Sequence, residues 1–357
     1  MKKDVRTVPP KEDVLMKPRI RDIAAVAKVS PATVSNALNG KPGVSAAVTE
    51  QILAIAREMG YEPGSKARPE NDRQHVRLVL YKSHGLVVMD TEFFAELIEG
   101  IQMECQHNGL ELIVSHINML TDKDYKQRIR DFCAEECAGI LLLGTEMNSE
   151  DLKRFAGCKS PLVVLDNLFR HEPVHSVVMN NYDAGYQATN ALYAAGHRRI
   201  DHITSATHFN NNRYRRKGYE AAMTEHQLAF GPENLWHVTP SIEGAYHEMT
   251  RHLQSGRKLP TAFFAANDLM AIGCIRALTE AGYKVPEDVS IIGMDDTAVC
   301  QACMPPLSTI RVYRKDLGAA AIRTLLNIAP VMQHSVIKTE LSVDLVMRNS
   351  VKVLAQE

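Results

Sequence analysis

The stretch VSPATVSNALNG, Val29 to Gly40, decides how the first part of this chain folds. Ser30 and Pro31 together predict a helix start, because a serine hydroxyl can accept from the first free amides and a proline at the first helical position loses no hydrogen bond. Asn39-Gly40 is a typical helix end. The stretch therefore predicts one short helix that carries several small polar side chains.

Two further helices are expected on either side of this one. In RIRDIAAVAKVS, residues 19–30, the apolar side chains Ile20, Ile23 and Ala27 recur at helical spacing. A third helix is expected over residues 47–59. Two short helices joined by a tight turn and braced by a third form a helix-turn-helix unit, whose second helix lies in the major groove of DNA.

The second helix of such a unit has a packing side and a DNA side. Val34 and Leu38 are expected to hold it against the other helices. The side chains left facing the DNA are Ala32, Thr33, Ser35 and Asn36. A generic three-helix surface domain explains the same helix pattern, so the pattern alone leaves both interpretations open.

Residues 19–63 closely resemble the DNA-binding head of the LacI/GalR family of bacterial transcription regulators, and the pattern V-S-x-x-T-V-S-x-x-L-N is highly specific to that family. The resemblance implies that the helix opening at Pro31 reads base edges, with Thr33 and Ser35 near phosphates. Of the expected base-reading side chains, only Asn36 is bidentate, which suits adenine. The expected DNA-binding residues are Ser30, Pro31, Ala32, Thr33, Ser35, Asn36, Asn39 and Arg68.

The segment after Pro63 departs from the family's pattern. LacI/GalR regulators continue into a hinge helix whose leucine enters the minor groove, whereas here Pro69 and Glu70 stand where a serine and that leucine are expected. A proline inside a helix costs about 3 kcal/mol, and a carboxylate is repelled by the phosphates. We therefore expect residues 64–75 to be an extended linker without a leucine wedge, and residues 1–17 to be a disordered extension.

Short apolar runs separated by helical stretches begin at Val76. Buried strands are expected at 76–81, 110–116, 138–144, 161–167 and 175–180, and in a second set at 199–205, 261–267 and 289–295. Helices are expected at 92–109, 124–137, 182–195, 213–226, 244–255 and 268–282. Such alternation predicts parallel sheets covered on both faces. The expected fold class is an all-α helix-turn-helix head plus an α/β body of two doubly wound parallel-sheet lobes.

Residues 76–350 resemble the effector domain of the same family, which has a periplasmic-binding-protein-like fold. Blocks such as PTAFFAANDLMAIG and VPEDVSIIGMDD carry the resemblance. It implies an effector-binding and dimerisation domain over residues 76–357, with the head at 18–63. The first lobe is expected at about 76–180 plus 310–340, and the second at about 181–309 plus 341–357.

Ligands of open parallel sheets bind beyond the carboxyl ends of the strands. Side chains expected at those ends are Phe93, Phe94, Asp166, Asn167, Asn267, Asp268, Asp295 and Asp296. By resemblance, Arg215, Asn267 and Asp295 fall on the family's main ligand-contacting positions. The expected effector-binding set is Phe93, Asp166, Arg215, Asn267 and Asp295.

The chemistry of this set suits polyols, because a guanidinium donates, a carboxylate accepts from paired hydroxyls and an amide does either. An interlobe salt bridge is the alternative role of Arg215 and of Asp295. For Tyr81 and Phe94 we expect a place in the core. Thr91-Glu92 replaces the family's Asn-Pro before the two phenylalanines, so a sugar, an amino sugar, a nucleoside and a purine all stay open as ligands.

Composition bounds the remaining classes of function. Residues 1–76 hold 13 Lys and Arg against 9 Asp and Glu, whereas the remainder holds 28 against 33, so a slightly basic head precedes an acidic body. No apolar run suits a membrane span or a secretory signal. Seven cysteines without a dense pattern predict reduced thiols and a cytoplasmic protein, with Cys300 and Cys303 structural. No metal site, cofactor motif or catalytic constellation is found.

Together these features predict a DNA-binding transcriptional repressor rather than an enzyme. A homodimer is expected to present two recognition helices to a pseudo-palindromic operator, while a small molecule bound between the lobes changes the operator affinity. A receptor-like small-molecule-binding protein with a weak or vestigial DNA-binding head is the alternative.

Overall fold

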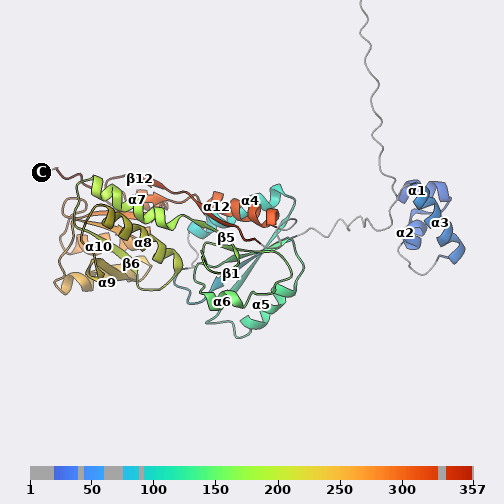
Figure 1. The fold of residues 1–357 in the computed structure, drawn as a ribbon, viewed down its shortest axis with the longest axis horizontal. Coiled ribbons are helices and arrows are strands. Elements are labelled where there is room, and N and C mark those ends of the chain that lie inside the picture. The colour runs from blue at the N-terminus through green and yellow to red at the C-terminus, as the bar shows by residue number, and fades with distance from the viewer. Residues whose placement is uncertain (1–19, 39–43, 60–74, 88–91, 329–334, 356–357) are drawn as a thin grey trace, which may run out of the picture. The chain divides into compact units, whose positions relative to one another are not determined.

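The computed structural model describes residues 20–38, 44–59, 75–87, 92–328 and 335–355. They belong to two compact units, a helical head and an α/β body, and each is described by itself (Figure 1). The expectations for residues 1–17, for the linker as far as residue 74 and for Asn39 and Arg68 lie outside the described residues.

The head consists of three helices that pack on one another: α1 (Ile20–Ala27), α2 (Pro31–Leu38) and α3 (Ala46–Glu58). Its small core is apolar throughout and comprises Ile23, Ala24, Val34, Ala37, Ile52 and Ala56. Val34 is fully buried and Leu38 packs against this core, as the sequence predicted. The backbone of Lys28, at φ 54°, turns the chain between α1 and α2.

The first lobe of the body, lobe 1, is built on a parallel sheet of six strands in the order β11-β5-β4-β3-β1-β2. These strands are β1 (His75–Lys82), β2 (Glu111–Asn118), β3 (Gly139–Leu143), β4 (Leu162–Leu165), β5 (His175–Met179) and β11 (Lys338–Leu341). The helices are α4 (Glu92–His107), α5 (Tyr125–Ala134), α6 (Ser149–Lys153) and α12 (Arg314–Ile328). Helices α4 and α12 pack together on one face of the sheet, and α5 and α6 cover the other (Figure 1).

The second lobe, lobe 2, repeats this plan with six strands in the order β12-β10-β9-β8-β6-β7, of which only β12 runs antiparallel to its neighbour. The strands are β6 (Ile200–Ser205), β7 (Leu235–Val238), β8 (Ala262–Ala265), β9 (Ser290–Asp295), β10 (Ser308–Arg311) and β12 (Asp344–Val346). The helical segments are α7 (Asn181–Ala194), α8 (Asn210–Glu225), η1 (Pro232–Asn234), α9 (Ile242–Gln254), α10 (Asp268–Glu280) and α11 (Val299–Ala302). The α7–α8 pair and the α9–α10 pair pack against separate apolar clusters, so the two doubly wound lobes are confirmed.

Two glycines let α7 and α8 approach closely. A Cβ on Gly185 would collide with the backbone carbonyl of Arg215, and one on Gly218 would collide with that of Tyr182. This crossing fixes the part of α8 that carries Arg215.

Three expectations about the body need correction. The stretch 110–116 was expected to be a buried strand, but β2 lies at the sheet edge, and Ile113 and Val114 are 36% and 40% exposed. Helix α8 begins at Asn210 instead of residue 213. The thiols were expected to be reduced, but Cys133, at the end of α5, forms a disulfide with Cys158, because the loop before β4 packs against α5 and the Lys159 amide donates to the Cys133 carbonyl at 2.9 Å.

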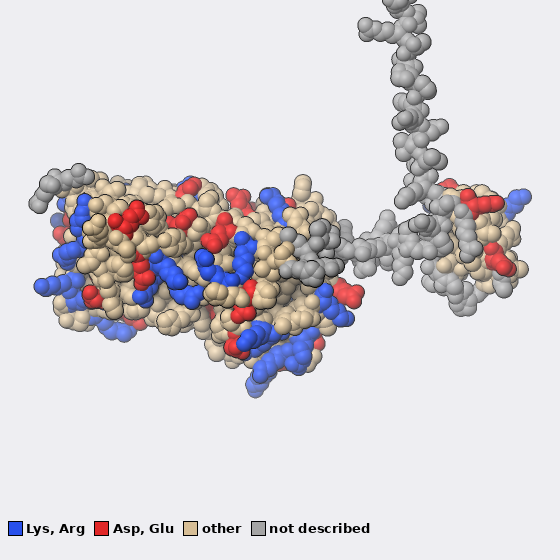
Figure 2. Space-filling view, viewed as in Figure 1, with Lys and Arg blue, Asp and Glu red and all other residues tan. Residues whose placement is uncertain are grey.

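No helix in the described part of the chain is long and apolar enough to cross a membrane. Basic and acidic side chains are interspersed over the face of the body that Figure 2 shows.

Candidate functional site

The first turn of α2 is closed by Ser30. Its Oγ accepts from the Thr33 backbone N–H at 3.1 Å and lies 2.8 Å from the Thr33 hydroxyl. This is the serine cap that the sequence predicted, and it ties the Ser30 and Thr33 hydroxyls to each other.

The remaining polar side chains of α2 keep access to solvent. Ser35 and Asn36 are partly exposed, whereas Val34 and Ala37 between and beside them are buried. Pro31 is exposed at the start of the helix. The surface of α2 that is left open therefore contains the positions expected to face DNA, apart from Ala32, whose side chain is not described.

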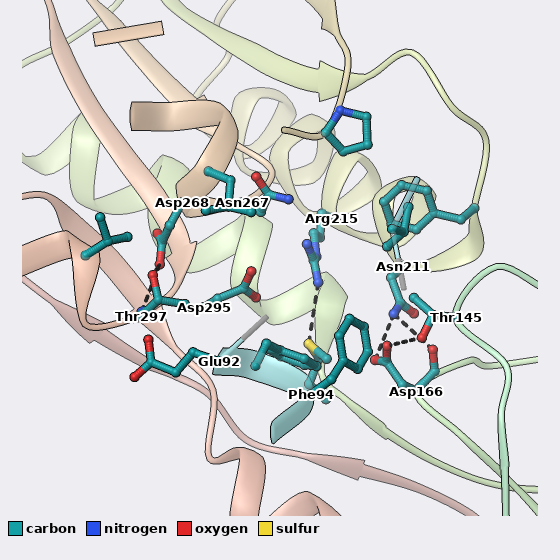
Figure 3. A pocket seen from close by; sticks show the side chains of 17 residues that line it. Glu92, Phe94, Thr145, Asp166, Asn211, Arg215, Asn267, Asp268, Asp295 and Thr297 are labelled. Atoms are coloured by element: carbon teal, nitrogen blue, oxygen red, sulfur yellow. Dashed lines mark hydrogen bonds between the residues drawn. The ribbon is translucent and has the colours of Figure 1, made fainter. Parts of the chain in front are cut away.

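A cavity with about 850 Å³ of empty space, its mouth included, lies between the two lobes at the carboxyl ends of their strands (Figure 3). Its wall contains every residue of the set expected from the sequence: Phe93, Asp166, Arg215, Asn267 and Asp295.

Arg215 extends from α8 into the cavity, where Figure 3 shows its guanidinium between Asp295 on one side and Asn211 on the other. Its Nε donates to Asn181 Oδ1 at 2.8 Å and its Nη1 to the Ala266 carbonyl at 2.5 Å. These bonds hold the guanidinium plane in place. Among the described residues no ion pair includes Arg215 or Asp295, so the alternative of an interlobe salt bridge is not found in this structure.

Asp295 ends β9 with φ 117°, a strained value for a residue other than glycine. Its Oδ1 is buried and lacks a hydrogen-bond partner in the described structure. Burial raises the pKa of Asp295 to about 6, although the positive charges of Arg215 and Arg314 oppose the shift. An unsatisfied carboxylate oxygen at a cavity wall is suited to accept from a bound hydroxyl or amine.

Asp268 lies beside Asp295 but is fully satisfied within the protein. Its Oδ1 accepts from the Thr309 hydroxyl at 2.6 Å, and its Oδ2 from the Thr297 amide at 3.1 Å. Burial and the negative charge of Asp295 raise the pKa of Asp268 to about 7. Asn267 caps α10 through a 2.8 Å bond from the Met270 amide to its Oδ1.

Asp166 forms the opposite wall, in lobe 1, with φ 58°. Its Oδ2 accepts from Thr145 at 2.6 Å, and its Oδ1 accepts from Asn211 of lobe 2 at 2.9 Å. Burial raises the pKa of Asp166 to about 6, against the Thr145 bond and the charge of Arg215. Asn211 is absent from the expected site because the helix was expected to begin at residue 213; the three adjacent amides at the start of α8 were the available signal.

Several hydrogen bonds cross between the lobes at this cavity. Besides the Asn211–Asp166 bond, Asn210 Nδ2 donates to Asn167 Oδ1 at 2.8 Å. Glu92, at the start of α4, accepts from the Ala298 amide at 2.9 Å. Arg314, at the start of α12, donates from Nη1 to the Asp295 carbonyl at 2.6 Å. These bonds join the two lobes beside the cavity.

Phe93 and Phe94 supply the apolar wall. Their rings meet edge to face, with centroids 5.1 Å apart. Phe94 is buried, as expected, and also lines the cavity, whereas Tyr81 lies in the core of lobe 1 on the α5 side of the sheet. An aromatic wall facing a guanidinium, carboxylates and an amide suits a small polyhydroxylated molecule.

The described residues contain no group of three or more His, Cys, Asp or Glu side chains arranged to hold a metal ion. The residues that surround the cavity thus offer hydrogen bonds and stacking.

Comparison with known proteins agrees with this architecture. Residues 19–64 match the model of the lacI family of bacterial regulatory proteins, and residues 189–351 match a periplasmic binding protein-like domain. The HTH-type transcriptional repressor PurR of Haemophilus influenzae is 33% identical over 341 residues, which cover 93% of this chain and 98% of that protein. The ribose operon repressor of the same species is 33% identical over 311 residues, which cover 86% and 90%.

Two solved structures share the fold. The lac repressor dimer bound to operator and the anti-inducer ONPF has a TM-score of 0.70 at 25% identity, over 94% of this chain and 100% of that chain. A LacI family transcriptional regulator from Enterococcus faecium with bound ribose has a TM-score of 0.64 at 24% identity, over 79% and 100%.

Proposed function

Because this chain belongs to the lacI family of bacterial regulatory proteins and is a DNA-binding transcriptional repressor rather than an enzyme, we propose that its cavity binds a sugar, with ribose the first candidate. The observation that carries this proposal is the pairing, across one cavity, of a fixed guanidinium on Arg215 with an unsatisfied carboxylate oxygen on Asp295. Adjacent hydroxyls on one sugar face can bond both groups, while the opposite face stacks on Phe93.

Ribose is the first candidate because one relative, 33% identical, carries the name of a ribose operon repressor, while solved structures of the same fold hold ribose, glucose or cellobiose. The ribose is held by the Enterococcus faecium regulator. Phe93, Asp166, Arg215, Asn267 and Asp295 form the proposed effector-binding set.

On the DNA side, we assign contact with the operator to the exposed surface of α2 and to its flanks. The proposed DNA-binding residues are Ser30, Pro31, Ala32, Thr33, Ser35, Asn36, Asn39 and Arg68. Two copies of the chain, paired as in the lac repressor dimer, would place two α2 helices on a pseudo-palindromic operator in the cytoplasm. The proposed bounds are 18–63 for the head, 64–75 for the linker and 76–357 for the body.

The effector acts by changing how the lobes meet. The contacts Asn211–Asp166, Asn210–Asn167 and Glu92–Ala298 surround the cavity, so a molecule that enters it alters the strength of all three. A coupling of about 1–3 kcal/mol would change operator affinity between several-fold and a hundredfold.

The test is selection of bound DNA from a random library by the purified protein, with and without ribose. A two-fold symmetric motif whose yield changes with ribose supports the proposal, and half-sites recovered at more than one spacing support the extended linker. A symmetric motif that ignores ribose overturns the choice of effector. Recovery of no motif under either condition favours the receptor-like alternative.

A further inference from the structure

A buried carboxylate close to the cavity accepts hydrogen bonds from four backbone amides of one neighbouring segment. Glu146, in the turn between β3 and α6, has a side chain that is fully inaccessible to solvent. Its Oε2 accepts from the backbone amides of Ser83, His84 and Gly85 at 2.9, 3.0 and 2.9 Å. Its Oε1 accepts from the Val87 amide at 2.9 Å.

The loop that Glu146 holds is the one that leaves β1 towards α4. Gly85, at φ +68°, lets successive N–H groups converge on one point, an arrangement known to bind anions. Here the anion is supplied by the protein itself. Val87 at the end of the described part of this loop lines the cavity, so the carboxylate fixes one wall residue directly.

The same turn also holds Asp166 and Asn167, which follow β4. Thr145, next to Glu146, donates to Asp166 Oδ2, and the carbonyls of Gly144 and Met147 accept from Asn167 Nδ2 at 2.6 and 3.0 Å. Asn167 in turn accepts from Asn210 of lobe 2. The turn 144–147 thus joins the β1–α4 loop to the strand end that contacts lobe 2.

We propose that Glu146 is a positioning residue for the effector: its carboxylate holds residues 83–87 beside the cavity, and without that charge these residues loosen and the effector binds more weakly. The second half of this proposal rests on the proposed function of the cavity, whereas the first half does not.

The substitution Glu146→Gln tests the charge with little change of shape. One oxygen becomes an NH₂ group, which faces backbone N–H donors and cannot accept from them, and the remaining bonds lose their charge assistance. Hydrogen bonds to a charged acceptor are strong enough that we expect the loop amides to exchange about tenfold faster or more.

The control removes a loop-holding carboxylate elsewhere in lobe 1. Asp122 accepts from the Asn118 amide at 3.0 Å and from Arg128 at 2.8 Å, and it does not line the cavity. Asp122→Asn therefore makes the same carboxylate-to-amide change as Glu146→Gln, but away from the cavity. Gly85→Ala weakens the same contact by changing the loop instead of the carboxylate. The φ of Gly85 is unfavourable for alanine, while no atom of the described residues lies within 4 Å of the added Cβ, so the change strains the backbone without a steric clash.

Two measurements are made on the full chain. Hydrogen–deuterium exchange is followed in peptides that cover residues 83–87 and strands β3 and β4, and ribose affinity is measured by calorimetric titration. We expect Glu146→Gln and Gly85→Ala to speed exchange in 83–87, to leave the strands protected and to weaken ribose binding about tenfold, while Asp122→Asn changes neither.

Unchanged exchange in 83–87 in a folded Glu146→Gln protein overturns the proposal, and so does faster exchange with unaltered ribose affinity. If Glu146→Gln fails to fold, Gly85→Ala decides by the same criteria. If the wild-type protein takes up no ribose, the sugar assignment fails, and the exchange result by itself still decides whether Glu146 holds the loop.

Discussion

Asn211 and Asp166 are bound to each other across the cleft. The Nδ2 of Asn211, on α8 in lobe 2, donates to the Asp166 Oδ1 at 2.9 Å and lies 3.0 Å from the Asp166 carbonyl oxygen. Both side chains are buried. The bond therefore links the position of lobe 2 to a carboxylate that faces the proposed effector.

Replacing Asn211 by alanine leaves the buried Asp166 Oδ1 without its donor. An unmet buried acceptor costs about 1–3 kcal/mol, so Asn211→Ala should weaken sugar binding by roughly tenfold, as measured by calorimetry. Operator affinity without sugar should change less than the response to sugar does. Ser255→Ala, an exposed change at the end of α9, serves as the control. Full retention of the sugar response in Asn211→Ala would show that this bond carries no coupling.

Arg215→Lys should abolish the response to sugar although it keeps the positive charge. An ammonium group cannot reproduce the fork that bonds Asn181 and the Ala266 carbonyl together. DNA binding without sugar should persist, because α1, α2 and α3 form their own core. Gel-shift titrations with and without ribose check both points, and Arg216→Lys, on the exposed side of the same helix, is the matched control. A normal response of operator binding to ribose in Arg215→Lys would refute the assigned role.

Asp295→Asn should stabilise the sugar-free protein near pH 7.5, by an amount that shrinks as the pH falls towards 5. Burial raises the pKa of Asp295 to about 6, from an ordinary value of 3.8. The folded state therefore holds a proton that the unfolded state has released between those values, so the wild-type protein gains stability as pH falls through about 6. Above that pH range the buried carboxylate is ionised and lowers the stability of the folded state, and asparagine removes this cost.

Denaturant unfolding of both proteins at several pH values measures this difference, and each unit of raised pKa corresponds to about 1.4 kcal/mol. His197 and His202 are buried and have lowered pKa values, so they make the protein less stable as the pH falls. This contribution is the same in both proteins and cancels when their stabilities are compared. A stability difference that is independent of pH would contradict the assignment of a raised pKa to Asp295.

Sugar binding by the wild-type protein should release protons near pH 6. A sugar hydroxyl that donates a hydrogen bond to the free Asp295 Oδ1 stabilises the ionised carboxylate, so the pKa of Asp295 is lower in the complex. Affinity should accordingly rise between pH 5 and 7. Calorimetry in buffers of different ionisation enthalpy counts the protons, and Asp295→Asn should release fewer. Proton uptake instead of release would reverse the proposed polarity of this contact.

Asn36→Ala should relax base preference at one position in each half-site, at a cost of roughly 1–3 kcal/mol for the preferred base. Asn36 is partly exposed on α2 and its amide can bond adenine at two points. Ser45→Ala is the contrasting variant, because the Ser45 hydroxyl accepts from the Val48 amide at the start of α3 and its loss should destabilise the head by about 1 kcal/mol without altering base preference. Selection experiments on both proteins separate these effects; equal weakening on all sequences would make Asn36 a phosphate contact.

Local sequence determined much of this protein. Ser30-Pro31 sets the start of α2 because capping and proline geometry involve only neighbouring residues. The alternation of apolar strands and helices determined both lobes, since burial on two faces needs apolar side chains throughout a strand. Phe93, Asp166, Asn267 and Asp295 could be placed at one cavity because parallel strands all end at the same edge of their sheets, whereas Arg215 was placed there by its resemblance to a ligand-contacting position of the family.

Only the tertiary structure decided which of these groups are already satisfied. Local sequence cannot show that Arg215 bonds Asn181 and the Ala266 carbonyl instead of Asp295, or that Asp268 is saturated while Asp295 keeps an empty oxygen. Nor can it show that Glu146 collects amides from a loop some sixty residues earlier, or that Asn211 belongs to a helix and reaches the other lobe. Each of these facts depends on which distant atoms the folded chain brings within about 3 Å, because a hydrogen bond is decided by distance and direction rather than by residue type.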